Sequence, residues 1–379
     1  MKKTLVALAA LASVSAFAQV TLSGNIDIAT SKVGFDDPLA TTSLQQRKAT
    51  TVGSYATAST STINMMMEED LGGGLKSAAR VEFDPRAVLS DSGANLGTHS
   101  TYVGIMGNFG AIKFGKMDSA AVLANGQQSP LGTGLGSGYG VLQAQVIAAS
   151  RYNRSVKFES ATYGGISGSV MYTPGVNGDG VNLTATTGLP LARSVTELSL
   201  AYAQGPLAAT FINLNTGSGN GATATGTITP ISYSTTTLSP STSTNILTAQ
   251  YTMGNNSFHF GYNRGQTLGV AAATTNYFDV VTVAAGLDTS GRRLGYKYVM
   301  GDMDFIVQTG QQKIATTTAS VAYNTRKVSG LRAVKNLSKN TAVYIGYEAY
   351  NTGTTLASTA VDLDGGRYSI TSFGIKKAF

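Results

Sequence analysis

Seven short turns alternate with long polar stretches along this chain, and this alternation constrains the fold more than any other feature. Runs of about ten residues flank each turn, the length with which a tilted strand crosses a bilayer. Seven short and eight long connections join sixteen strands. The sequence therefore predicts an all-β protein, a 16-stranded antiparallel transmembrane β-barrel. The turns lie near Asp70 to Gly74, Gly107 to Gly110, Thr162 to Gly165, Gln204 to Pro206, Gly254 to Asn256, Gly301 to Asp302 and Leu337 to Asn340.

Apolar and polar residues alternate within these runs, which indicates that each strand has one lipid face and one water face. Leu22 and Ile26 alternate with Ser23 and Asp27 in the first run. In the run of residues 75–84, the same alternation places the charged side chains on one face of the strand. An arginine that faced lipid at the bilayer midplane would cost about 2–4 kcal/mol. We therefore expect the charged face to line a wet interior.

The start of the chain predicts an export signal. Residues 1–18 carry Lys2 and Lys3, then an apolar run, then the small-x-small site Ala16-Phe17-Ala18. Residues 19–379 are then expected to form one barrel domain, since no linker or composition shift divides them. The chain has no cysteine, which excludes disulfides and thiolate metal sites. No residue pattern predicts a cofactor, a metal site or a nucleic-acid surface, and we expect none of these.

Six segments distributed along the chain resemble the general porins of Gram-negative outer membranes. They are "VTLSGNIDIA" (20–29), "EEDLGGGLKSAARVEF" (68–83), "TYVGIMGNFGAIKFGK" (101–116), "NRSVKFESATYGGISGSVMYTP" (153–174), "KNLSKNTAVYIGYEAY" (335–350) and "SFGIKKAF" (372–379). The resemblance implies short periplasmic turns, long extracellular loops and a homotrimer of barrels. It also implies a third long loop that folds into the lumen, where basic wall residues face acidic loop residues. Phe379 resembles the terminal signal that the outer-membrane assembly machinery reads.

The sequence departs from this family at several expected lumen positions. Asn25, Thr62, Met66 and His99 stand where relatives carry basic residues. The third loop, residues 118–149, has Asp118 as its only acid and a glycine-rich run at 129–140. We therefore expect a weaker field in the constriction than in a fully charged one, and only a mild preference for anions.

The predicted function is passive diffusion of small hydrophilic solutes and ions through a water-filled channel in the outer membrane. Lipid and lipopolysaccharide are the expected surroundings, and no enzymatic activity is expected, because the chain has only two histidines, on well-separated strands. A substrate-specific channel and a surface adhesin or receptor barrel remain alternatives. The residues expected to line the pore or its constriction are Lys76, Arg80, Glu82, His99, Lys113, Asp118, Arg151, Lys157 and Arg332.

Overall fold

The structure is a computed structural model, and it describes most of the chain after the expected signal. The expected signal peptide at 1–18 lies outside the described residues, as do most residues of the long connections. Described are residues 19–36, 48–54, 56–85, 97–139, 142, 150–174, 194–217, 223–228, 231–236, 242–267, 287–316, 324–351 and 367–379.

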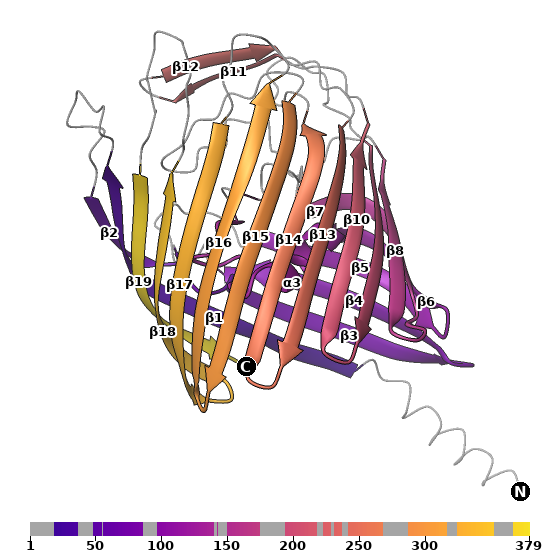
Figure 1. Cartoon of the computed structure of the whole chain (residues 1–379). Helices are drawn as coiled ribbons and strands as arrows, with labels where there is room; N and C mark the ends of the chain where they lie inside the picture. Colours follow the sequence, from indigo (N-terminus) through magenta and orange to yellow (C-terminus); the bar gives the residue numbers. More distant parts are fainter. Residues whose placement is uncertain are drawn as a thin grey trace, which may run out of the picture.

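Sixteen strands form one closed antiparallel barrel, as predicted (Figure 1). Each barrel strand pairs with its neighbours along the chain, and β1 pairs with β19 to close the ring. The barrel strands are β1 (Gln19–Asp36), β3 (Thr62–Gly72), β4 (Leu75–Asp84), β5 (Gly97–Gly107), β6 (Gly110–Asp118), β7 (Arg151–Ser160), β8 (Ile166–Thr173), β9 (Val195–Gln204), β10 (Leu207–Thr216), β13 (Thr242–Met253), β14 (Asn256–Thr267), β15 (Leu287–Met300), β16 (Met303–Thr316), β17 (Asn324–Ser338), β18 (Thr341–Asn351) and β19 (Arg367–Ala378).

All seven predicted short turns are confirmed, and all lie at the same end of the barrel (Figure 1). Gly205 and Gly254 have φ of 62° and 57°, a left-handed conformation that glycine adopts without a steric penalty. In the turn between β15 and β16, the Lys335 ammonium holds the pKa of the exposed Asp302 carboxyl below its ordinary value. The start of β1 and the last residue of the chain also lie at this end, where Gly24 and Phe379 exchange two backbone hydrogen bonds of 3.1 and 3.0 Å.

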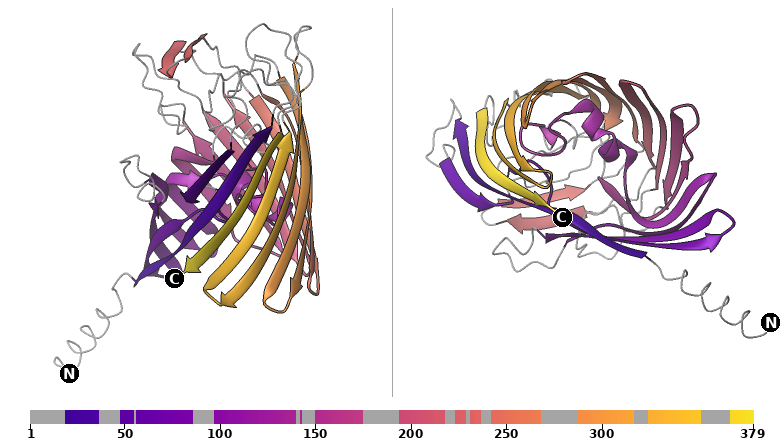
Figure 2. Two further views of the ribbon diagram at one scale, coloured as in Figure 1. Left: turned by 90° about the vertical axis from the view of Figure 1, so that its left-hand side faces the viewer. Right: turned by 90° about the horizontal axis from the view of Figure 1, so that it is seen from below.

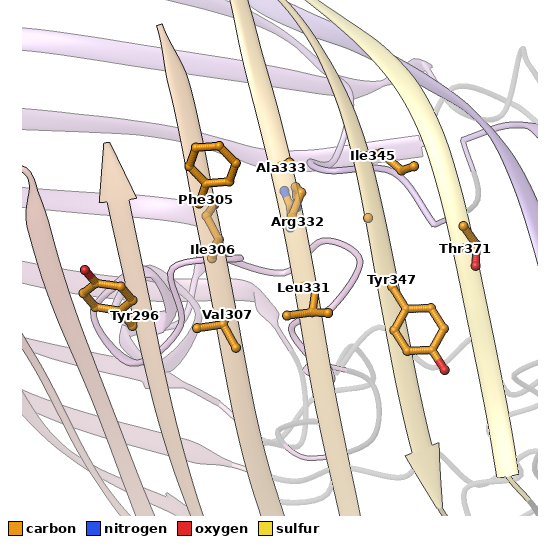
Figure 3. A pocket seen from close by; sticks show the side chains of 11 residues that line it. Tyr296, Phe305, Ile306, Val307, Leu331, Arg332, Ala333, Ile345, Tyr347 and Thr371 are labelled. Atoms are coloured by element: carbon orange, nitrogen blue, oxygen red, sulfur yellow. The ribbon is translucent and has the colours of Figure 1, made fainter. Parts of the chain in front are cut away.

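The outer face of the barrel is apolar. Figure 3 looks at it across β15 to β19, where a groove of about 450 Å³ is lined mainly by aliphatic and aromatic side chains. Leu331 is 52% exposed there, whereas Arg332, the next residue, is buried on the inner side. This alternation is what a wall between lipid and water requires. Within the described part of the chain, no helix has the length and hydropathy needed to cross a membrane.

The second transmembrane strand is interrupted, which the sequence did not predict. A short strand, β2 (Lys48–Gly53), pairs with residues 29–34 of β1. β3 pairs with residues 19–25 of β1, which lie nearer the short turns. Residues 54–61 separate the two pieces. Two further short strands in the connection between β10 and β13, β11 (Thr223–Ile228) and β12 (Ile231–Thr236), pair with each other as a hairpin outside the barrel sheet.

The third long loop enters the barrel, as predicted. Its first part forms two single-turn helices, α2 (Ala120–Leu123) and α3 (Asn125–Gln128). In the view along the barrel from the turn end, these helices lie inside the ring of strands (Figure 2). We use the name third loop for residues 119–150, of which 119–139, 142 and 150 are described.

Candidate functional site

The inner face of β4 to β7, named here the charged wall, carries most of the predicted pore residues. On β4, the Arg80 guanidinium lies 2.8 Å from a carboxylate oxygen of Glu82 and donates to Asn64 at 2.6 Å. His99 on β5 lies between two carboxylates, with Nδ1 3.3 Å from Glu82 and Nε2 3.1 Å from Asp84. Three predicted residues are therefore brought together, and Asp84 completes the cluster.

A second cluster on the charged wall joins β6 and β7. The Glu159 carboxylate forms ion pairs with Lys113 and with Lys157, the latter at 3.1 Å. The Lys113 ammonium also lies 5.0 Å from the centre of the Tyr102 ring, within the range of a cation–π interaction. Each charge is thus partly neutralised by a neighbour on the same wall.

Asp118 and Arg151 pair with each other where the third loop leaves and rejoins the wall. Arg151 Nε lies 2.7 Å from an Asp118 oxygen, and the Ser100 hydroxyl donates to the other oxygen at 2.8 Å. Asp118 is the last residue of β6, so it belongs to the wall rather than to the loop interior. Lys76 is separate from these groups: it is exposed and lies opposite Asp70 beside the β3–β4 turn.

The inner face of β13 to β18, named here the covered wall, lies under the third loop. Each of five strands gives the loop a polar contact. Thr248 donates to Gln127 at 2.7 Å, Arg293 donates to Asn125 at 3.3 Å, and Gln308 donates to the Ser137 carbonyl at 2.6 Å. His259 Nδ1 lies 3.1 Å from the Gly126 carbonyl. The Glu348 carboxylate accepts from the Gly136 and Gly138 amides, at 2.7 and 3.2 Å.

Glycines between these contacts let the loop backbone approach the wall closely. A Cβ on Gly330 would lie 2.0 Å from the Gly136 carbonyl oxygen, and one on Gly295 would lie 2.3 Å from Pro130. Such distances are far inside van der Waals contact, so only glycine fits at these positions. The start of the loop is held elsewhere, because the buried Glu197 of β9 accepts from the Ala120 amide at 2.5 Å.

Arg332 on β17 also binds the third loop. Its guanidinium is buried and donates to the carbonyls of Leu131 and Leu135, at 3.1 and 2.8 Å. It donates to the Ala58 carbonyl at 2.9 Å as well. Its side chain therefore faces loop backbone, in contrast to Arg80 and Lys113 on the charged wall.

Sequence reasoning missed Asp84 and Glu159, although the alternation contained the signal. Asp84 shares a strand face with Glu82, and Glu159 shares one with Lys157. It also missed the loop contacts of the covered wall, for which no local signal exists. Whether the predicted residues control conduction stays a prediction. The groups of acidic and histidine side chains in the described residues include none that could hold a metal ion.

Comparison with known proteins agrees with the closed barrel. A family model described as Gram-negative porin matches residues 4–355. The major outer membrane protein P.IB of Neisseria lactamica is 32% identical over 187 residues, 47% of this chain and 53% of that protein. A P.IB protein of Neisseria meningitidis serogroup B is 33% identical over 176 residues, 45% of this chain and 49% of that protein. The chain thus matches about half the length of these curated relatives.

Two solved structures show the same fold at low sequence identity. The anion-selective porin from Comamonas acidovorans is 19% identical, with a TM-score of 0.66 over 96% of this chain and 100% of that one. OmpT of Vibrio cholerae is 14% identical, with a TM-score of 0.65 over 96% of this chain and 98% of that one. Because its family model spans nearly the whole sequence, this chain belongs to the Gram-negative porin family of outer-membrane barrels.

Proposed function

We propose that the chain forms a passive, water-filled channel through the outer membrane for small hydrophilic solutes and ions. The observation that carries this proposal is the contrast between the two inner walls. The third loop covers one wall, whereas the charged wall keeps side chains such as Arg80 and Glu159 29% and 31% exposed inside a closed barrel. Charged side chains with water access favour a wet passage beside them. The mechanism has no catalytic turnover.

We propose that the channel prefers anions only weakly. The charged wall carries the five predicted cations Lys76, Arg80, Lys113, Arg151 and Lys157, against the four acids Glu82, Asp84, Asp118 and Glu159. Sequence reasoning counted two acids, so the excess of positive charge is smaller than expected. The described residues of the third loop add no charge. Screening over about 8 Å at physiological salt weakens the remaining field further.

Conductance in a planar bilayer tests the proposal. Purified protein is expected to give large steps of current, and the conductance per step should not saturate as the salt concentration rises. Across a KCl gradient, the zero-current potential is expected to be small and to have the sign of a channel that prefers chloride. Saturation by one solute would instead indicate a substrate-specific channel, and a membrane without steps would leave the adhesin or receptor barrel.

We propose a homotrimer in a lipid and lipopolysaccharide surrounding as the working form. The outward face of β1 supports this, because Val20 and Leu22 are 57% and 60% exposed in the isolated chain. An OmpT structure of Vibrio cholerae is described as a trimer form. Cross-linking in mild detergent is expected to give a species of three times the monomer mass, and a monomer alone would contradict this.

A further inference from the structure

The interruption of the second transmembrane strand sends a segment of chain into the lumen. Gly53 of β2 lies opposite Ala29, and Thr62 of β3 lies opposite Asn25. Between these two pairs, β1 has three residues, 26–28, whereas the second strand has eight, residues 54–61, of which residue 55 is not described. We name residues 54–61 the inward segment. A surplus this large cannot stay in the ladder, so the chain leaves the wall.

The inward segment is held at its base by a buried carboxylate. Asp27, fully buried, accepts from the Ser59 amide at 2.8 Å and from the Ser59 hydroxyl at 2.9 Å. The Tyr344 hydroxyl donates to the other Asp27 oxygen at 2.6 Å and accepts from the Ala58 amide at 3.0 Å. These contacts fix the path of the segment on the side of the lumen formed by β1 and β18.

The tip of the inward segment contacts the third loop. The Leu135 amide donates to the Thr57 carbonyl at 2.9 Å. Ala56 packs against a small apolar cluster that includes Leu135. A Cβ on Gly134 would lie 2.2 Å from the Ala58 carbonyl oxygen, so the two backbones are in direct contact. Two segments about 75 residues apart in sequence thus meet inside the barrel.

A single side chain joins the two segments to the wall. The Arg332 guanidinium donates to one carbonyl of the inward segment, Ala58, and to two of the third loop, Leu131 and Leu135. Arginine suits this task because its planar fork presents several donors in fixed directions. Lysine has one compact ammonium and cannot span the same three oxygens with the same geometry.

We propose that the inward segment and the third loop form a two-part constriction, and that Arg332 is the positioning residue that sets its width. The proposal rests on the channel function proposed above. It departs from the sequence prediction, in which the third loop alone narrows the pore and Arg332 lines it. Without Arg332, each segment keeps its own contacts with the wall, such as Ser59 with Asp27 and Gly136 with Glu348, but no side chain among the described residues binds both of them. The two segments then separate, which widens the passage.

Conductance and polymer exclusion in planar bilayers test this directly. Arg332→Ala is expected to raise single-channel conductance by about 1.5- to 2-fold, because passage depends on the width of the narrowest part. It should also admit larger polyethylene glycols than the wild type. Arg332→Lys is expected to fall between the two. Arg292→Ala is the matched control, because Arg292 is an exposed arginine that faces outward on β15 and touches neither segment.

Tyr344→Phe is a second variant that leaves the guanidinium in place. It removes the hydroxyl that binds Asp27 and Ala58, and it is expected to raise conductance less than Arg332→Ala does. If wild type conducts and both variants keep its conductance and polymer cut-off, the two-part constriction is wrong while the channel function stands. If the wild type gives no conductance, the proposed function itself fails.

A disulfide between the segments provides the decisive control. The chain has no native cysteine, so Ala56→Cys with Leu135→Cys introduces one pair: Ala56 packs against the cluster that contains Leu135, and the Leu135 amide binds the carbonyl of the next residue, Thr57. Copper phenanthroline with oxygen takes two electrons and two protons from the thiols as the bond forms. In the Arg332→Ala background, oxidation is expected to restore the wild-type conductance, and reduction to remove it again. Equal conductance in the oxidised and reduced states, once the bond has formed, would overturn the proposal.

Discussion

The charged wall and the covered wall follow the same inward and outward alternation but present different side chains to the lumen. On the charged wall, cations and acids pair within a strand, as Lys157 does with Glu159, and between neighbouring strands, as Lys113 does with Glu159. On the covered wall, polar groups such as Gln308 and Glu348 bond to loop backbone, and glycines leave room for it.

This difference shows how one barrel combines a rigid narrowing with a wet passage. Backbone carbonyls and amides of a buried loop need partners, and the covered wall supplies them one strand at a time. The charges on the other wall keep their water and act on solutes. The two walls are therefore expected to respond differently to substitution. Changes on the covered wall should alter the shape of the pore, and changes on the charged wall should alter its ion selectivity.

The largest expected effect is on the covered wall, from Gly330→Ala. The added Cβ meets the Gly136 backbone, 2.0 Å from its oxygen, and overpacking of this kind costs about 1–3 kcal/mol. The third loop is expected to shift, which lowers the unfolding temperature in detergent and changes single-channel conductance. Gly34→Ala on β1 is the matched control, because its Cβ would meet the Ser369 hydroxyl at 3.0 Å and no atom of the third loop within 4 Å. Equal effects of the two variants would contradict the close packing of the loop.

The next largest effect concerns barrel closure rather than either wall. Phe379 exchanges two backbone hydrogen bonds with Gly24, and its ring is half exposed on the rim. Deletion of Phe379 is expected to lower the amount of folded barrel in the outer membrane severalfold without changing the conductance of the channels that assemble. Phe379→Ala keeps the backbone bonds and separates the two contributions. Normal assembly with altered conductance would reverse the assignment.

A smaller effect is expected on the charged wall, from Arg80→Glu. The substitution changes the local charge by two next to Glu82 and places two carboxylates together. The zero-current potential across a KCl gradient is expected to move toward cation preference, more strongly at low salt because screening is weaker there. Arg332→Gln is the comparison on the covered wall, where the buried charge is expected to affect selectivity less. An unchanged potential in Arg80→Glu would remove the charged wall from the selectivity mechanism.

The smallest effect is expected outside both walls, from Asp302→Asn. Lys335 lowers the pKa of this carboxyl, so the pair stabilises the fold above the ordinary aspartate pKa and stops doing so as pH falls through the lowered value. Exposed pairs contribute little. The unfolding temperature is expected to drop slightly at neutral pH and to match the wild type at strongly acidic pH. A larger drop in acid than at neutral pH would contradict this sign.

The barrel was predictable because its signals are local and repeated. Each turn carries its own glycine or asparagine, and each strand carries its own alternation, as at Gly254 and along β4. Errors at single positions do not change the strand count. The same alternation placed Arg80 and Glu82 on one face, and the family resemblance placed His99 in the lumen; the structure brings the three together.

The interior arrangement was not predictable from these signals. Glu348 binds Gly136 across 212 residues of sequence, and Arg332 binds Ala58 across 274. An inward arginine looks the same in sequence whether it faces water or loop carbonyls. The interrupted second strand was missed because most of residues 54–61 are serine, threonine or alanine, a composition that is also typical of the end of a loop. These features depend on hydrogen bonds between wall side chains and the backbone groups of distant loop residues, and the sequence of a single strand does not encode such bonds.

Cysteine accessibility tests the contrast between the walls most directly, since the wild type has no thiol. Arg80→Cys places one on the charged wall, and Gln312→Cys places one on β16, where the native side chain is fully buried. Charged methanethiosulfonate reagents are added to open channels in a bilayer while current is recorded. Rapid modification and a drop in current are expected for Arg80→Cys, and no reaction is expected for Gln312→Cys. Rapid modification of Gln312→Cys with an inert Arg80→Cys would contradict the contrast between the walls.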